Sequence, residues 1–151
     1  MKDVILTISL IIVFLVAGVI FLAIVKNNPT VTLKAEREVK IGETVFKTEV
    51  VDNPALWTKG LSGRASLPED GGMLFIFPDQ QIRNFWMKDM KFPIDIIWIR
   101  DNKIIGIVMG AEPAFQESYE IYTSPEPADT VLEINAGLSQ KLGIQVGDTV
   151  N

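Results

Sequence analysis

Hydrophobic residues are concentrated in two parts of the chain, and the two parts have different patterns. The first is a continuous apolar run over residues 4–25, in which Thr7 and Ser9 are the only polar side chains. The second is residues 71–109, where short apolar runs alternate with turn-forming residues. The first pattern is typical of a membrane-spanning helix, and the second indicates the core of a β-rich domain.

The apolar run from Val4 to Val25 predicts a transmembrane helix. At about 1.5 Å per residue it is roughly 33 Å long, which is enough to cross a bilayer. A cleaved signal peptide would have a shorter apolar region followed by a small-residue cleavage site, and residues 21–25 offer none. We therefore expect residues 1–25 to be an uncleaved membrane anchor, with a signal sequence as the alternative, and residues 26–30 to be a linker.

Charge near the anchor gives a prediction about membrane sidedness. Basic residues follow the run at Lys26, Lys34, Arg37 and Lys40, and the positive-inside rule would keep the next domain in the cytoplasm. Long domains are translocated largely regardless of such charges. We expect a single-pass protein of the cell membrane with an extracytoplasmic domain. This expectation opposes the charge count and rests partly on the family resemblance given below.

Residues 31–151 are predicted to form a single β-rich domain. Short segments with alternating or continuous apolar residues and turns at close spacing are typical of an all-β fold, mainly an antiparallel small sandwich or barrel. Asn53-Pro54 predicts the start of one short helix, and residues 138–142 before Gly143 predict another. Residues 112–127 are expected to be a long loop. The expected strands are 31–39, 45–51, 73–77, 84–90, 94–100, 103–109, 130–135 and a short one after Gly147-Asp148.

A tight hairpin is expected around Asp101-Asn102. This two-residue loop separates two apolar strands, residues 94–100 and 103–109. Both faces of the hairpin are apolar, so we expect it to lie centrally in the sheet. The loop sets the cross-strand pairs, which are Arg100 with Lys103, Trp98 with Ile105 and Asp95 with Val108.

Composition excludes several kinds of chemistry. The chain has no cysteine and no histidine, so disulfides, a cysteine nucleophile, a histidine base and a Ser-His-Asp triad are impossible. Its net charge of −5, without a basic cluster, argues against nucleic acid as a partner. No metal and no cofactor are predicted.

Four motifs carry a resemblance to a known family: GLSGR, GGMLFIF, FWMKDMKFPIDIIWI and LEINAGLSQKLGIQVGD. From about Val45 to its end, the chain resembles the uncharacterised bacterial and archaeal domain-of-unknown-function family 192. The resemblance implies a small, mostly β domain, often behind a signal or anchor, with no established activity. Ser62 stands where the family usually has methionine, and Asp89 where it usually has asparagine. The matching positions are Gly60, Leu61, Arg64, Met73, Leu74, Phe75, Trp86, Met87, Asp95, Leu132, Glu133, Gly137, Gly147 and Asp148.

Asp95 is the first candidate for a functional residue, because it is a carboxylate in a strand that is otherwise apolar on both faces. An unpaired buried charge is costly, so Asp95 is expected to have a partner. Arg64 is the expected partner, with Lys88 as the second choice. Two roles are open: a buried ion pair or backbone brace that fixes loops, or a ligand clamp or acid/base group.

A set of apolar side chains completes the predicted binding site. Met73, Phe75, Trp86 and Met87 are most simply core residues, but they could also form an aromatic platform in a cleft. The binding site is therefore predicted to consist of Arg64, Met73, Phe75, Trp86, Met87, Lys88 and Asp95, and no catalytic residue is assigned.

Three functions remain open on the sequence. The favoured one is a non-enzymatic module that binds a small ligand, such as a carbohydrate, or an envelope partner. A hydrolase would need two carboxyl groups across a cleft, and Asp95 with Glu133 or Glu112 could supply them. Against this role, the alternation of inward-facing and outward-facing side chains in the strand 130–135 predicts that Glu133 faces solvent. A purely structural accessory domain is the third possibility. The oligomeric state is not predicted.

Overall fold

The computed structural model describes residues 34–114 and 120–151. The predicted anchor, residues 4–25, and the linker, residues 26–30, lie outside the described residues. Within the described part, no helix is long and apolar enough to span a bilayer.

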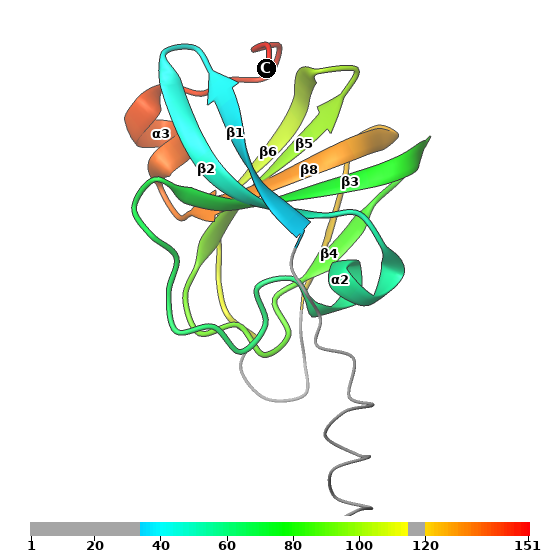
Figure 1. The fold of residues 1–151 in the computed structure, drawn as a ribbon, viewed down its shortest axis with the longest axis vertical. Helices are drawn as coiled ribbons and strands as arrows, with labels where there is room; N and C mark the ends of the chain where they lie inside the picture. Colours follow the sequence, from blue (N-terminus) through cyan, green and yellow to red (C-terminus); the bar gives the residue numbers. More distant parts are fainter. Residues whose placement is uncertain (1–33, 115–119) are drawn as a thin grey trace, which may run out of the picture. The chain divides into compact units, whose positions relative to one another are not determined.

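The described residues form two β-sheets and two short helices (Figure 1). The main sheet has six strands in the order β1-β2-β3-β8-β5-β6, and β4 pairs with β7 in a separate sheet. Every strand pair is antiparallel except β2 with β3. This confirms the predicted all-β, mainly antiparallel class with short helices. The elements are β1 Lys34–Ile41, β2 Thr44–Val51, α2 Pro54–Lys59, β3 Gly71–Gln81, β4 Asn84–Trp86, β5 Ile94–Arg100, β6 Lys103–Ala111, β7 Ile121–Thr123, β8 Ala128–Asn135 and α3 Leu138–Leu142.

Local sequence explains the limits of α2. The Asn53 side chain accepts a hydrogen bond from the backbone N–H of Leu56 at 3.1 Å, and Pro54 occupies the first helical turn. The helix ends at Gly60, whose φ of 45° is unfavourable for residues with a Cβ. The Asn53-Pro54 start is the signal that predicted the helix.

The β5–β6 hairpin forms as expected at its turn, where Asp101 and Asn102 have positive φ and Arg100 pairs with Lys103. Beyond the turn the predicted register is wrong. Trp98 pairs with Gly106, because a β-bulge places one additional residue, Ile105, in β6. The hairpin is also not wholly central, since β6 is an edge strand of the main sheet.

Two other predicted boundaries were wrong. Only Asn84–Trp86 of the expected strand 84–90 is extended, and the chain then turns, with Asp89 at φ 57°. The expected long loop contains a three-residue strand, Ile121–Thr123, which pairs with β4. Three residues are too few to show a periodic pattern.

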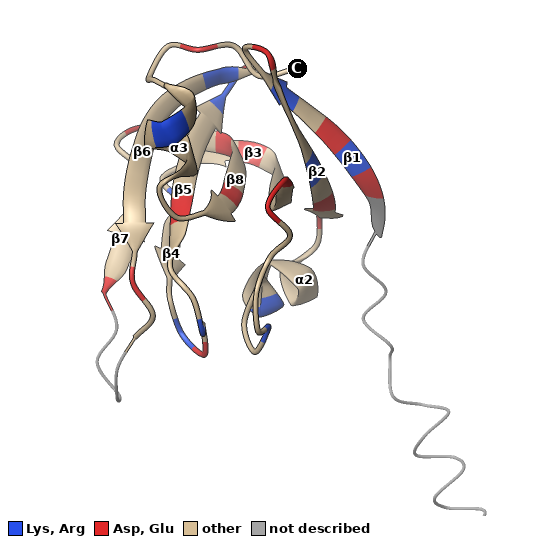
Figure 2. Cartoon of the chain, turned by 90° about the vertical axis from the view of Figure 1, so that its left-hand side faces the viewer, with Lys and Arg blue, Asp and Glu red and all other residues tan. Residues whose placement is uncertain are grey.

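The main sheet has a separate hydrophobic core on each face. Consecutive residues alternate between the two cores, as Leu74 and Phe75 do in β3 and Ile96 and Ile97 do in β5. One core includes the buried residues Val51, Leu56, Leu61, Met73, Phe75, Met87, Ile96, Trp98 and Val131. The other includes Val39, Ile41, Phe46, Leu74, Ile97, Ile99, Leu132, Ile134, Ile144 and Val150. Outside the cores, acidic and basic residues alternate along β1 (Figure 2).

The C-terminal residues connect the two edge strands of the main sheet. Lys40 of β1 exchanges two backbone hydrogen bonds with Asn151, at 2.8 and 2.9 Å. On the other side, Ile104 of β6 donates to the carbonyl of Asp148, and Val150 donates to the carbonyl of Asn102. The C-terminal residues therefore close the gap between the two edges of the sheet at this end, with Val150 buried in one of the cores.

Deletion of residues 149–151 should destabilise the full-length protein. The deletion removes three backbone hydrogen bonds and the buried Val150 side chain, so we expect the free energy of unfolding to fall by about 3 kcal/mol or more. Urea unfolding followed by circular dichroism measures it. Asn151→Ala keeps the backbone bonds and should change stability by less than about 0.5 kcal/mol. Equal stability of the deletion variant and wild type would contradict the closure described here.

Candidate functional site

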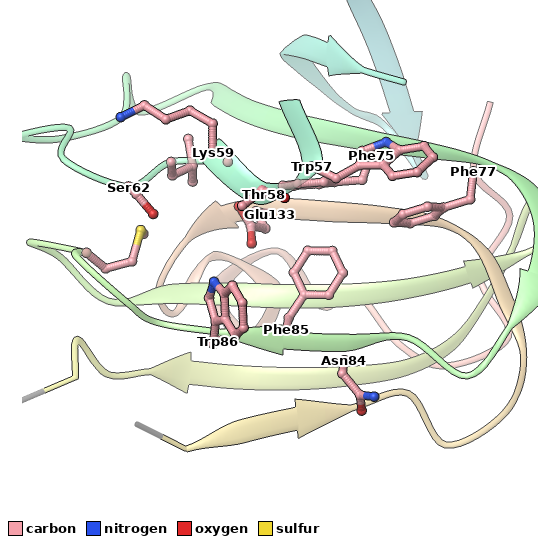
Figure 3. Close-up of a pocket in the computed structure, with 13 residues that line it drawn as sticks. Trp57, Thr58, Lys59, Ser62, Phe75, Phe77, Asn84, Phe85, Trp86 and Glu133 are labelled. Carbon is pink, nitrogen blue, oxygen red and sulfur yellow. The ribbon is translucent and has the colours of Figure 1, made fainter. Parts of the chain in front are cut away.

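A cavity of about 230 Å³ lies on the α2 side of the main sheet (Figure 3). Its walls come from α2 and the loop after it, β3, β4, the loop after β4, and β8. The lining residues are Trp57, Thr58, Lys59, Gly60, Leu61, Ser62, Phe75, Phe77, Asn84, Phe85, Trp86, Met90 and Glu133.

Aromatic rings form much of the cavity wall, and they hold one another in place. The rings of Trp57 and Phe77 lie 4.8 Å apart between centroids, and those of Phe75 and Phe85 meet edge to face at 4.9 Å. The indole N–H of Trp57 donates to the carbonyl of Val51 at 3.2 Å, which fixes its orientation. The cavity therefore has a preformed apolar surface.

The rim of the cavity joins two of the motifs that carry the family resemblance. The hydroxyl of Ser62 donates to the carbonyl of Lys88 at 2.9 Å, and the N–H of Gly63 donates to the carbonyl of Asp89 at 2.8 Å. Asp89 has a left-handed backbone, which asparagine and aspartate both tolerate, so its departure from the usual asparagine preserves the turn.

Glu133 carries the single carboxyl group among the described residues of the cavity wall. It lies on β8 between Met73 of β3 and Ile96 of β5, and it is only 6% exposed. Its carboxyl group points into the space above Phe85 and Trp86 (Figure 3). Among the described residues, no hydrogen-bond partner reaches its Oε2.

Burial controls the protonation of Glu133. Desolvation raises the pKa of its carboxyl group from 4.5 to about 8, and the positive charge of Arg64 opposes this only in part. At neutral pH the group is therefore mostly protonated, so that it presents a hydrogen-bond donor to the cavity.

Arg64 is paired with Glu49, so its predicted pairing with Asp95 is wrong. Nη2 of Arg64 donates to one carboxylate oxygen of Glu49 at 2.6 Å, and Nη1 donates to the other. This bidentate hydrogen bonding, followed by attraction to Glu49 and Glu133, raises the pKa of Arg64. Arg64 thus lies beside the cavity as one half of an ion pair, not in its wall.

Asp95 is bound entirely by backbone groups. Its Oδ1 accepts hydrogen bonds from the N–H groups of Gly110 at 2.8 Å and Gly137 at 3.0 Å, and its Oδ2 accepts one from Ser139 at 2.9 Å. These donors belong to the end of β6 and the start of α3. Of the two roles left open for Asp95, the structure shows the backbone brace.

The carboxylate pair that the alternative hydrolase function would need is not formed by Asp95 and Glu133. Asp95 is opposite Ile134 in the sheet, and Glu133 is opposite Ile96, so the two carboxyl groups are on opposite faces. Glu112 is exposed and does not line the cavity. The solvent-facing position expected for Glu133 is wrong because α2 and β4 cover that face.

The other predicted site residues separate into groups. Phe75 and Trp86 line the cavity, and Trp86 is 45% exposed at its mouth. Met73 and Met87 are buried in the core. Lys88 is exposed and lies at a neighbouring hollow that also includes Trp86. One signal could have identified Glu133: like Asp95, it is a carboxylate between apolar residues in a strand that is buried on both faces.

Asp95→Asn should destabilise the full-length protein by about 2–4 kcal/mol. The variant loses the negative charge that strengthens three hydrogen bonds. In addition, the side-chain NH2 of asparagine cannot accept a hydrogen bond, so at least one of the backbone N–H groups loses its acceptor. Chemical denaturation at neutral pH measures the loss. Asp89→Asn, an exposed position where asparagine suits the backbone, serves as the matched control and should stay near wild-type stability. A wild-type value for Asp95→Asn would rule out the brace.

Glu133 should make stability depend on pH. Because its pKa is raised on folding, the folded state holds a proton that the unfolded state releases, so the free energy of unfolding should fall as pH rises from about 4.5 to about 8. Relative to Glu133→Gln, wild type should lose roughly 5 kcal/mol over that range and no more above it. Urea unfolding of both proteins across pH measures the difference, and a difference that does not change with pH would contradict the buried acid.

Comparisons with known proteins agree with this fold. A solved protein of unknown function from Novosphingobium aromaticivorans is 32% identical, with a TM-score of 0.74, over 82% of this chain and 89% of that one. A solved protein from Sinorhizobium meliloti, described as a candidate transcription regulator, is 30% identical, also with a TM-score of 0.74, over 80% of this chain and 95% of that one. No curated protein matches the sequence.

The sequence pattern of family DUF192, described as "Uncharacterized ACR", matches residues 36–151. This match covers both sheets, the cavity and all four motifs of the resemblance, and it confirms the predicted family. The chain therefore belongs to the domain-of-unknown-function family 192.

Proposed function

We propose that this domain is a binding module that holds a small organic ligand in the cavity above Glu133. The observation that carries the proposal is a buried carboxyl group with an unpartnered oxygen inside a cavity walled by aromatic rings. A largely apolar, preformed pocket with few polar groups is the usual form of a small-molecule site. A strongly shifted pKa in such a pocket adds to that argument.

The cavity volume limits the ligand. An enclosed apolar cavity of about 150 Å³ holds benzene, so about 230 Å³ is suited to a single ring or a compact group of similar size. An unpaired buried polar atom costs about 1–3 kcal/mol, and a ligand that pairs with Oε2 of Glu133 would remove that cost. Glu133 thus replaces Arg64 and Asp95 as the polar centre of the proposed site.

A binding role is favoured over hydrolysis. Acid/base hydrolysis of a glycoside needs two carboxyl groups about 5–10 Å apart, and Glu133 is the only carboxyl group among the described residues of the cavity wall. A purely structural role would not account for the open cavity or for the buried oxygen of Glu133 that has no partner among the described residues. The binding experiment below distinguishes a binding role from a structural one.

The proposed setting is the outer face of a cell membrane. The apolar run from Val4 to Val25 would anchor the domain, which would meet a small molecule, a carbohydrate or an envelope partner there. Nucleic acid is not proposed as a partner. The net charge is −5, and acidic residues are interspersed with basic ones in the view of Figure 2.

A thermal-shift screen of the full-length protein tests the binding role. The probes are benzyl alcohol, glucose, N-acetylglucosamine, tert-butyl alcohol and tetramethylammonium chloride. A probe that binds the folded state raises the melting temperature by mass action, by about 3 °C at ten times its dissociation constant. We expect at least one probe to give such a shift at millimolar concentration.

Two variants at one position locate the binding. Thr58 is exposed on α2 and lines the cavity, so Thr58→Trp should fill its mouth and abolish the shift, whereas Thr58→Ala should preserve it. A screen with no shift for any probe would overturn the binding role in favour of a structural one. A shift that survives in Thr58→Trp would place the ligand elsewhere on the protein.

A further inference from the structure

Among the described residues of the cavity wall, Glu133 is the one acidic group, and the basic side chains near it are directed elsewhere or already paired. Among the described lining residues, Lys59 and Glu133 are the only charged ones. The Lys59 ammonium points away from Glu133 (Figure 3) and lies beside Gly63, 3.7 Å from where a Cβ at that residue would be. Arg64, the nearest other cation, is already neutralised by Glu49.

The rest of the wall is suited to a cation that has no hydrogen bonds to donate. Five aromatic side chains line the cavity, and their π-faces attract positive charge. One of these rings already shows this behaviour, since the guanidinium of Arg83 lies 4.0 Å from the centroid of Phe77. The nearby hydroxyl of Ser62 is occupied by the carbonyl of Lys88 and adds no free donor.

We propose that the cavity binds a methylated ammonium group, with aromatic rings around the cation and the carboxylate of Glu133 as its counter-charge. The methyl groups would contact the rings, because a quaternary ammonium is apolar on its surface while its charge is retained. This proposal rests on the proposed function above, and it names the ligand class of the same site.

Binding of such a cation should release a proton. Glu133 is mostly protonated in the empty cavity at neutral pH, and a bound cation favours the carboxylate. The charged group that acts on Glu133 is Arg64 after α2, which is paired with Glu49 of β2, and Lys59 of α2 lines the same cavity but points away. The strands β3, β4 and β5 contribute uncharged side chains to its surroundings. Burial places the pKa of Glu133 at about 8, inside the range from pH 6 to 9, so Glu133 should dominate the pH dependence.

Titration with tetramethylammonium tests the proposal, with tert-butyl alcohol as a neutral molecule of similar shape. The tryptophan indole N–H signals of the full-length protein, measured by NMR, report occupancy, because Trp57 and Trp86 line the cavity. We expect the affinity for tetramethylammonium to increase about 100-fold from pH 6 to pH 9, as Glu133 loses its proton. The affinity for tert-butyl alcohol should change by less than about twofold.

Variants separate charge from shape. Glu133→Gln keeps the size of the side chain and should abolish the pH dependence. It should lower cation affinity at pH 9 by about 100-fold or more, because the amide is neutral like the protonated acid, while tert-butyl alcohol binding remains. Trp86→Leu, at the exposed mouth, should weaken cation binding by about threefold and preserve its pH dependence. Binding of a neutral probe from the screen without cation binding would overturn the ligand class and leave the binding role intact. If no probe binds, both the binding role and the ligand class are overturned. If the cation binds with an affinity that changes neither with pH nor in Glu133→Gln, the ligand class is overturned.

Discussion

The constraint on which this fold depends is the burial of a charge in its central strands. Asp95 is wholly inaccessible on β5, and its carboxylate is stabilised by backbone N–H groups from two distant segments. Gly110 at the end of β6 and the turn from Gly137 to Ser139 are thereby held against the sheet. A charge in this environment requires such partners, so the positions of α3 and of the end of β6 follow from the presence of Asp95.

Glu133 is also a buried carboxyl group, but it does not have the backbone N–H partners that stabilise Asp95. It lies on the neighbouring strand, but its side chain faces the opposite core, where five aromatic side chains line the cavity beside it. The pKa of the carboxyl group rises, and one oxygen keeps no partner among the described residues. The fold thus satisfies one buried carboxylate completely and leaves the other facing a cavity. This difference separates the structural residue from the candidate functional one.

The family motifs meet around this cavity although they are far apart in the sequence. The loop after α2 and the loop after β4 are tied by the hydrogen bonds of Ser62 and Gly63, while Phe75 and Glu133 supply the floor. The opposite face of the sheet is completed by the C-terminal residues, which bond to both β1 and β6. The face covered by α2 therefore carries both a hydrophobic core and the cavity that contains Glu133.

The sequence by itself determined most of the strands, the family and the local turns, but not the extent of β4 or the presence of β7. Alternating apolar residues, the Asn53-Pro54 helix start and the Asp101-Asn102 turn are decided by nearby residues, and the structure confirms them. It also marked Asp95 as a charge in need of partners. The tertiary structure decided which groups those partners are. They are backbone N–H groups of β6 and α3, and nothing in the sequence of β5 identifies them. It also decided that Glu133 is buried, since alternation gives the face of a strand on which a side chain lies but not what covers that face. The β5–β6 register depended on a bulge at Ile105, and the cavity on the packing of α2 and β4 over β8, both of which arise from contacts between distant residues.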